Sequence, residues 1–134
     1  MTRPTKVGIS TDQAPPPRGA YSQAVVVGDL VYTAGFGPVD PVTRQIVGDD
    51  VAEQTRRTLR NVAAALKTAG ADLQDVVKVT AHLADIDNDW DGFDTAYREF
   101  FDEPRPARTT AGSNLGGILV EIDVVAVRGC GLRP

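Results

Sequence analysis

The strongest hydrophobic pattern in the chain runs from Leu119 to Val127, where β-branched residues dominate and neither glycine nor proline intervenes. Successive side chains of a strand point to opposite faces of a sheet. One face of this segment is wholly apolar and consists of Val120, Ile122, Val124 and Ala126. The other face mixes carboxylates with aliphatic residues and consists of Leu119, Glu121, Asp123, Val125 and Val127. A strand that is apolar on both faces is usually covered on both, so we expect Glu121 to be partly enclosed.

Shorter apolar runs predict the other strands. Ala24–Val27 and Leu30–Ala34 flank Gly28-Asp29, a dipeptide typical of a two-residue hairpin turn. The segment Val76–Leu83 alternates between an apolar face and a face that carries Lys78, Thr80 and His82. Two further short strands are expected, at Lys6–Ile9 and at Gln45–Val47.

Two helices are predicted from the spacing of apolar residues. The first begins after Asp50, whose carboxylate can cap a helix, and continues to about Ala69, where Gly70 provides a stop. Its buried stripe recurs at three- and four-residue steps and consists of Val51, Thr55, Leu59, Val62, Leu66 and Ala69. The second helix is expected to be capped by Asp89. Its buried side is aromatic and consists of Trp90, Phe93, Tyr97, Phe100 and Phe101.

These elements follow one another as hairpin, helix, strand, helix and strand, without an internal repeat or an interdomain linker. Residues 1–134 are therefore predicted to form one α+β domain with both helices on one face of a sheet. The second face of that sheet then has no helix to cover its apolar residues, which include Val125 and Val127. A partner subunit is the natural cover for such a face.

Composition narrows the class of protein. The chain has 134 residues, 42% of them hydrophobic and 24% charged, which is typical of a globular domain. Its net charge of −4 disfavours a nucleic-acid partner, because phosphate binding requires a basic surface. No stretch approaches the roughly 20 apolar residues of a membrane span, and no apolar N-terminal run suggests export. We therefore expect a cytoplasmic protein without a membrane partner, in which the lone Cys130 forms no intrachain disulfide.

One arginine and one glutamate form the candidate reactive pair. Arg108 lies in an extended run that follows Arg105 and Pro106, and Glu121 lies in the last strand. Two adjacent strands could deliver both side chains to one small pocket. Arg108 and Glu121 could equally form a structural ion pair, and composition alone favours that second interpretation.

The segment PARTT at Pro106–Thr110, followed by a short loop and VEIDVVAVR, resembles the C-terminal signature of the Rid family (reactive-intermediate deaminases, YjgF-type, also called endoribonuclease L-PSP). Arg18–Gln23 resembles the family's Gly-Pro-Tyr-Ser-Gln motif, with Ala20 in place of proline. The resemblance extends over nearly the whole chain. It implies a chorismate-mutase-like fold with a mixed sheet, and a homotrimer with sites between subunits. The resemblance also favours a shared functional site for Arg108 and Glu121 over a structural ion pair.

The resemblance implies roles for single residues. Arg108 matches the arginine that grips a substrate carboxylate, and Glu121 matches the glutamate that orients water. The matched substrate-binding positions are Tyr21, Gly35, Phe36, Asp94 and Thr110. Three of them depart from the family pattern, because glutamine is usual at Phe36, asparagine at Asp94 and cysteine at Thr110. Without the resemblance, Tyr21 would be interpreted as a turn residue whose ring packs on the core.

The implied reaction is the hydrolysis of a reactive 2-imino acid, the tautomer of an enamine, to a 2-oxo acid and ammonia. An imine is already electrophilic, so positioning, one water and a proton acceptor suffice without a cofactor or a metal. His82 is the only histidine, which excludes metal sites built on several histidines. No nucleophile motif accompanies His82 or Cys130. If Asp94 touches the substrate, an anionic side chain on that substrate is disfavoured.

Three alternatives stay open. The chain could be a non-catalytic trimer that binds small carboxylates as a regulator or acts as a chaperone-like surface, although the retained Arg108 favours an enzyme. It could also deaminate a larger substrate, such as an aminomuconate. Endoribonuclease activity, the older label of the family, is disfavoured by the acidic net charge and by the absence of a histidine pair.

Overall fold

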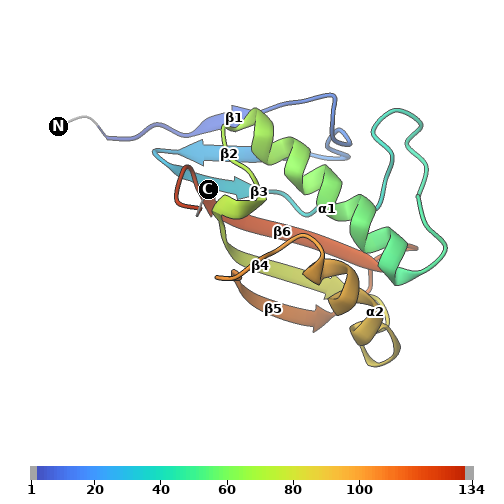
Figure 1. The fold of residues 1–134 in the computed structure, drawn as a ribbon. Coiled ribbons are helices and arrows are strands. Elements are labelled where there is room, and N and C mark those ends of the chain that lie inside the picture. Colours follow the sequence, from blue (N-terminus) through green and yellow to red (C-terminus); the bar gives the residue numbers. More distant parts are fainter. Residues whose placement is uncertain (1–2, 132–134) are drawn as a thin grey trace.

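The computed structural model describes residues 3–131, which form a six-stranded mixed sheet with two α-helices against one of its faces (Figure 1). The strands are β1 (Val7–Ile9), β2 (Ala24–Val27), β3 (Leu30–Thr33), β4 (Val76–Leu83), β5 (Ala107–Gly112) and β6 (Val120–Val127). The helices are α1 (Val51–Thr68), α2 (Ile86–Arg98) and the short 3-10 helix η1 (Leu73–Asp75). The strand order across the sheet is β1-β2-β3-β6-β4-β5. The α+β architecture predicted from the sequence is confirmed.

Strand β6 lies in the interior of the sheet, paired antiparallel with β3 on one side and with β4 on the other. Its predicted alternation is confirmed, because its side chains are buried and partly buried in strict turn. The buried set faces the helices, is at most 2% exposed and consists of Val120, Ile122, Val124 and Ala126. Strand β5 pairs parallel with β4 and forms one edge of the sheet.

The two helices cover the buried side of the sheet, and an aspartate precedes each of them. Asp50 caps α1, since its side chain accepts a hydrogen bond of 2.8 Å from the backbone N–H of Glu53. Gly70, with a φ of +85°, follows the helix end, as expected. The expected cap of α2 is wrong: the cap residue is Asp85 and not Asp89. The helix begins one turn earlier because Ile86, its first residue, packs against the core.

Two further expectations differ from the structure. Gln45–Val47 forms no strand, and its only ladder contact is an isolated bridge between Ile46 and Val39. Leu119 does not lie on the helix-free face, because it precedes β6 and packs against the hydrophobic core. Its N–H donates to Gln54 Oε1 of α1 at 2.8 Å, and its carbonyl accepts from the N–H of Ala84 at 3.0 Å. These bonds hold Leu119 on the side of the helices.

The face of the sheet away from the helices leaves apolar side chains in contact with solvent. Leu30 and Tyr32 of β3 are 37% and 48% exposed. Their register partners on β6, Val127 and Val125, are only partly buried. Among residues 3–131 no helix covers this face, as the sequence pattern predicts.

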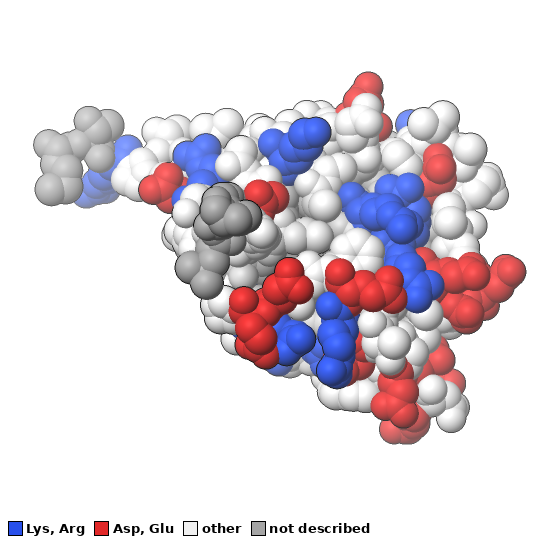
Figure 2. Space-filling view, in the orientation of Figure 1, with Lys and Arg blue, Asp and Glu red and all other residues white. Residues whose placement is uncertain are grey.

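The opposite, helix-bearing face has a mixed charge. Figure 2 shows basic and acidic side chains interleaved there, without a continuous basic stripe. Arg56 of α1, for example, pairs at 2.9 Å with Glu99, which follows α2, so the pair links the two helices. Among residues 3–131, no helix is long and apolar enough to cross a membrane.

Leu59 of α1 is completely buried, so Leu59→Ala is expected to lower the free energy of unfolding by about 2–5 kcal/mol through lost contacts and a residual cavity. Denaturant titration at one protein concentration measures the change. The matched control is Val42→Ala, because Val42 is 84% exposed and its truncation should alter stability by less than about 0.5 kcal/mol. Equal effects of the two substitutions would contradict the packing of α1.

Candidate active site

A groove of about 920 Å3 opens between the N-terminal loop, the loop that follows β3 and the loop that leads into β6. Its polar lining consists of Arg18, Tyr21, Gln23, Arg44, Gln45 and Glu121. Gly35, Phe36 and Ile118 contribute backbone and apolar surface. The structure therefore brings together four of the residues singled out from the sequence, which are Tyr21, Gly35, Phe36 and Glu121.

Glu121 and Gly35 approach each other very closely in this groove. A Cβ atom at residue 35 would lie only 2.1 Å from Glu121 Oε1, so a side chain there would occupy the place of the carboxylate. The neighbouring backbone is fixed by a reciprocal pair of hydrogen bonds. The N–H of Phe36 donates to the carbonyl of Ile122 at 2.9 Å, and the N–H of Ile122 donates to the carbonyl of Phe36 at 3.0 Å. Backbone pairing thus positions the glutamate beside the glycine.

The two aromatic residues of the groove differ in exposure. The ring of Phe36 is 5% exposed and belongs to the hydrophobic core, so Phe36 offers a ligand little side-chain surface. Tyr21 is 50% exposed, and its hydroxyl accepts a hydrogen bond of 3.1 Å from the backbone N–H of Arg18. A turn residue with its ring on the core would not have this exposure, so that interpretation of Tyr21 is wrong.

Gln23 fixes the N-terminal wall of the groove. Its side chain is almost completely buried, and its Nε2 donates to the carbonyls of Pro15, Ala14 and Thr11 at 2.8, 3.2 and 3.0 Å. Its Oε1 accepts from the backbone N–H of Thr11 at 2.7 Å. One buried amide therefore holds the loop that carries the Arg18 and Tyr21 side of the groove.

Arg108 and Thr110 lie elsewhere, on the helix-bearing face of β5, and Asp94 lies opposite them on α2. The Arg108 guanidinium donates to Asp94 Oδ1 at 2.8 Å, and its side chain is only 17% exposed. The guanidinium carbon also lies over three rings, at 4.6, 5.1 and 5.6 Å from the ring centres of Tyr97, Phe93 and Trp90. An arginine between aromatic faces and a carboxylate is held in one orientation.

The side chains around Arg108 shift the pKa values of Asp94 and Tyr97. The hydrogen bond from Arg108 holds the pKa of Asp94 below its usual value, against the opposing effect of burial and with a further contribution from Arg98. Burial raises the pKa of Tyr97 to about 12, and the nearby Arg108 cation opposes that rise. Among residues 3–131, the buried hydroxyl oxygen Thr110 Oγ1 near this cluster has no hydrogen-bond partner, which is uncommon for a buried hydroxyl.

Arg108 and Glu121 do not share a pocket within one chain, contrary to the expectation from adjacent strands. Strand β4 lies between β5 and β6. Arg108 is in register with Val79, whose side chain is in the core, whereas Glu121 is in register with His82 on the helix-free side. Register partners share a face of the sheet, so Arg108 and Glu121 project to opposite faces. The interpretation of Arg108 and Glu121 as a structural ion pair is also wrong, because the carboxylate that pairs with Arg108 is that of Asp94.

Asp94 is not an isolated negative charge. Its Oδ1 accepts from Arg108, and its Oδ2 accepts from Arg98 at 3.0 Å. The expectation that Asp94 repels an anionic substrate side chain assumed an uncompensated carboxylate. Two arginines compensate it in the fold, so that repulsion is largely removed.

Arg18 and Arg44 line the groove, although neither was expected there from the sequence. Arg18 is the first residue of the segment Arg18–Gln23 that resembles a family motif, which is a signal that could have suggested it. Arg44 follows the turn at residues 40–43 and has a φ of +64°. No sequence signal marks that conformation, because an arginine rarely adopts it.

The other residues considered as nucleophiles lie outside the groove lining. His82 Nδ1 lies 2.7 Å from Ser113 Oγ, and Cys130 Sγ lies 3.4 Å from the carbonyl oxygen of Asp75. The described part of the chain contains no group of three or more histidine, cysteine, aspartate or glutamate residues placed to hold a metal ion.

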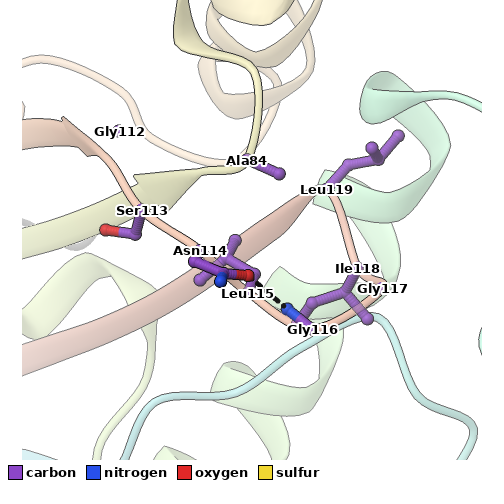
Figure 3. Close-up of a pocket in the computed structure, with 9 residues that line it drawn as sticks. All are labelled: Ala84, Gly112, Ser113, Asn114, Leu115, Gly116, Gly117, Ile118 and Leu119. Carbon is purple, nitrogen blue, oxygen red and sulfur yellow. Dashed lines mark hydrogen bonds between the residues drawn. The ribbon is translucent and has the colours of Figure 1, made fainter.

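A second hollow of about 620 Å3 lies along residues 112–119, which connect the end of β5 to the start of β6, and beside Ala84 (Figure 3). Asn114 Oδ1 accepts from the N–H of Gly116 at 3.4 Å and folds this loop on itself. None of the residues that line the hollow is ionisable. It therefore offers no proton acceptor, and the groove around Glu121 is the better candidate for chemistry.

The sheet order and the one-sided helices define a chorismate-mutase-like α+β domain. A protein of Thermotoga maritima has this fold, with a TM-score of 0.88 and 37% identity over 92% of this chain and 98% of that one. The TdcF protein of E. coli, solved with bound serine, has a TM-score of 0.85 and 36% identity over 92% and 99% of the two chains.

Sequence comparison identifies the family. The family model described as Endoribonuclease L-PSP matches residues 11–128. A RutC family protein of Pyrococcus abyssi is 44% identical over 122 residues, which are 90% of this chain and 95% of the relative. The 2-iminobutanoate/2-iminopropanoate deaminase of Bos taurus is 42% identical over 124 residues, which are 90% of this chain and 89% of the relative. AldR of Lactococcus lactis, named as a regulator, is 38% identical over 122 residues, or 88% and 94%. The chain belongs to the Rid (YjgF, endoribonuclease L-PSP) family.

Gly35→Ala is expected to displace the Glu121 side chain without unfolding the protein, because the added Cβ overlaps the flexible end of the glutamate. A crystal structure of the variant measures the displacement. Gly19→Ala is the matched control, since a Cβ at Gly19 meets only the Tyr21 ring at an ordinary 3.7 Å. A Glu121 carboxylate that keeps its place in Gly35→Ala would contradict the described contact.

Proposed function

We propose that this protein hydrolyses reactive 2-imino acids to 2-oxo acids and ammonia. Examples are 2-iminobutanoate and 2-iminopropanoate, which is the imine tautomer of 2-aminoacrylate. The observation that carries the proposal is the carboxylate of Glu121, held against Gly35 in an open groove. A second observation supports it, the largely buried and oriented cation of Arg108. Relatives at about 42% identity are named as deaminases of two such imines.

The proposed chemistry needs only groups that this chain supplies. Arg108 binds the substrate carboxylate, for which the planar guanidinium offers two parallel donors. Glu121 accepts a proton from a water molecule as the water oxygen bonds to the imine carbon. Glu121 passes this proton to the imine nitrogen, which leaves a carbon that bears one hydroxyl and one amino group. The hydroxyl proton then moves through Glu121 to the amino nitrogen, the C–N bond breaks, ammonia leaves, and the C–O bond becomes a carbonyl. The atoms balance as imino acid plus water to oxo acid plus ammonia.

Arg108 and Glu121 can act on one substrate only if two subunits meet. In one chain they lie on opposite faces of the sheet, with β4 between their strands. Strand β5, which carries Arg108, is an edge strand and is therefore accessible to a second subunit. We propose that Arg108 of one subunit completes the groove around Glu121 of the next.

A homotrimer follows from the same proposal. An interface that joins the β5 edge of one subunit to the groove of another uses two different surface patches, and such an interface forms a closed ring where the rotation between neighbours closes after a whole number of copies. The partly exposed Leu30, Tyr32, Val125 and Val127 on the helix-free face would then turn toward the other subunits. Three copies are the number that the family resemblance implies.

The bound serine of E. coli TdcF supports the same substrate class. Serine is a small amino acid with one α-carboxylate, the group that Arg108 is proposed to bind. TdcF is 36% identical to this chain, and the match covers 99% of the TdcF chain. A small 2-imino or 2-oxo acid is therefore the proposed ligand.

A non-catalytic, carboxylate-binding regulator is the second candidate. It is favoured by the relative AldR, which is named as a regulator. The two functions differ in one measurable respect, because a regulator would bind a 2-oxo acid without accelerating the loss of an imine. Faster loss of 2-iminobutanoate, generated in the assay by an amino-acid oxidase, supports the enzyme.

Light scattering at micromolar concentration is expected to give about three times the chain mass of 14.3 kDa. Val125→Asp should dissociate the assembly, because an unpaired charge in a buried apolar contact costs several kcal/mol. Thr68→Asp is the control, since Thr68 is exposed at the end of α1, on the helix-bearing face and outside the groove lining. A wild-type monomer at that concentration would exclude a site shared between subunits.

Arg108→Ala is expected to abolish detectable binding of a 2-oxo acid as well as turnover. Loss of one partner from a desolvated charge pair commonly costs about 2–5 kcal/mol, or roughly 30- to several-thousand-fold in affinity. Arg108→Lys should restore little, because one ammonium cannot reproduce the paired donors. Calorimetry and an imine assay measure both properties. The control is Arg98→Ala, which removes the more exposed partner of the same Asp94 and should leave binding near the wild-type value.

Glu121→Gln is expected to reduce turnover while 2-oxo acid binding stays close to that of the wild type, because glutamine is nearly isosteric but is a much weaker base. Melting temperatures of the Arg108 and Glu121 variants separate catalysis from folding. If activity falls only in proportion to lost folded protein, both residues are structural. Unchanged turnover in folded Arg108→Ala would end the catalytic proposal.

A further inference from the structure

Arg44 has an unusual backbone conformation in the groove. Among residues 3–131 it is the only non-glycine residue with a positive φ, at +64°. Glycine adopts this conformation freely, whereas a residue with a Cβ does so at a steric cost. The turn before it is already closed, because Asp40 Oδ1 accepts from the N–H groups of Val42 and Thr43 at 2.8 and 2.9 Å. The turn therefore does not require an arginine, and the side chain is the feature to explain.

Among residues 3–131, the Arg44 guanidinium has no partner of opposite charge. No ion pair of residues 3–131 includes Arg44 or Arg18, and both line the same groove. Glu121 is the only carboxylate in the lining. The groove thus holds two cations against one anion before any substrate carboxylate arrives. Strained residues in folded proteins cluster at ligand-binding positions, which agrees with the place of Arg44.

We infer that the groove accepts 2-imino acids whose side chain ends in a second carboxylate, bound by Arg44 with Arg18 beside it. The inference rests on the proposed function, in which Arg108 of a neighbouring subunit takes the first carboxylate and Glu121 acts at the imine carbon. A groove of about 920 Å3 has room for a substrate longer than three or four carbons. Asp94 does not oppose a dianionic substrate, since Arg98 and Arg108 bind its two oxygens.

Two product-like acids of equal length test this inference. Both 2-oxoglutarate and 2-oxopentanoate contain five carbons, but only the first has a second carboxylate. By calorimetry, the wild-type protein is expected to bind 2-oxoglutarate about tenfold more tightly, the effect of one partly exposed charge-assisted contact. Arg44→Gly should remove this preference and leave 2-oxopentanoate within about twofold of wild type.

The choice of glycine keeps the test interpretable. Glycine adopts a φ of +64° without steric strain. The Arg44→Gly variant should therefore have the same melting temperature as the wild type or a higher one. Arg60→Gln is the matched control, because it removes one exposed positive charge from α1, away from the groove lining, and should keep the preference. Arg44→Lys should keep part of it, since lysine retains the charge without the paired donors.

The outcomes separate this inference from the proposed function. Equal binding of the two oxo acids by the wild type, or an unchanged preference in Arg44→Gly, would overturn the inference about Arg44. If the wild-type protein still hydrolyses the imine in that case, the proposed function stands. Absence of binding for both acids, together with absence of imine turnover, would overturn the proposed function and this inference with it.

Discussion

Strand β6 is hydrogen-bonded to β3 and β4 along both of its edges, and the rest of the structure depends on the register that these neighbours impose. Ile122 points into the core, and its backbone pairs with Phe36. Glu121, one residue earlier, must then point to the other face, where Gly35 leaves room for its carboxylate. A slip of one residue would bury Glu121 and expose Ile122, so core packing and placement of the glutamate are the same constraint.

The place of β4 between β5 and β6 has an equally direct consequence. It separates the two residues proposed to act on one substrate and sends them to opposite faces of the sheet. A domain with this order cannot assemble them alone, however its side chains rotate. The uncovered apolar face and the accessible β5 edge provide the surfaces with which a second copy could complete the site.

The two cationic regions are built on different principles. Arg108 is largely desolvated, and its charge is compensated by Asp94 and by the ring faces of α2, which hold the guanidinium in place. Arg44 lies in the groove without a carboxylate partner among residues 3–131 and on a backbone that arginine rarely adopts. The first arrangement favours precise orientation of a ligand, and the second leaves an unsatisfied charge for a ligand to meet.

Local pattern determined a large part of this protein. The alternation in β6, the Gly28-Asp29 hairpin and the Asp50 cap all follow from neighbours within a few residues, and the structure confirms them. The resemblance supplied the family and four residues that meet in the groove. Only the tertiary structure decided that Arg108 bonds Asp94 and not Glu121, that α2 begins at Ile86, and that Arg44 faces the groove with a positive φ. The physical reason is that these features depend on strand order and long-range packing, which bring together residues whose separation along the chain carries no periodic signal.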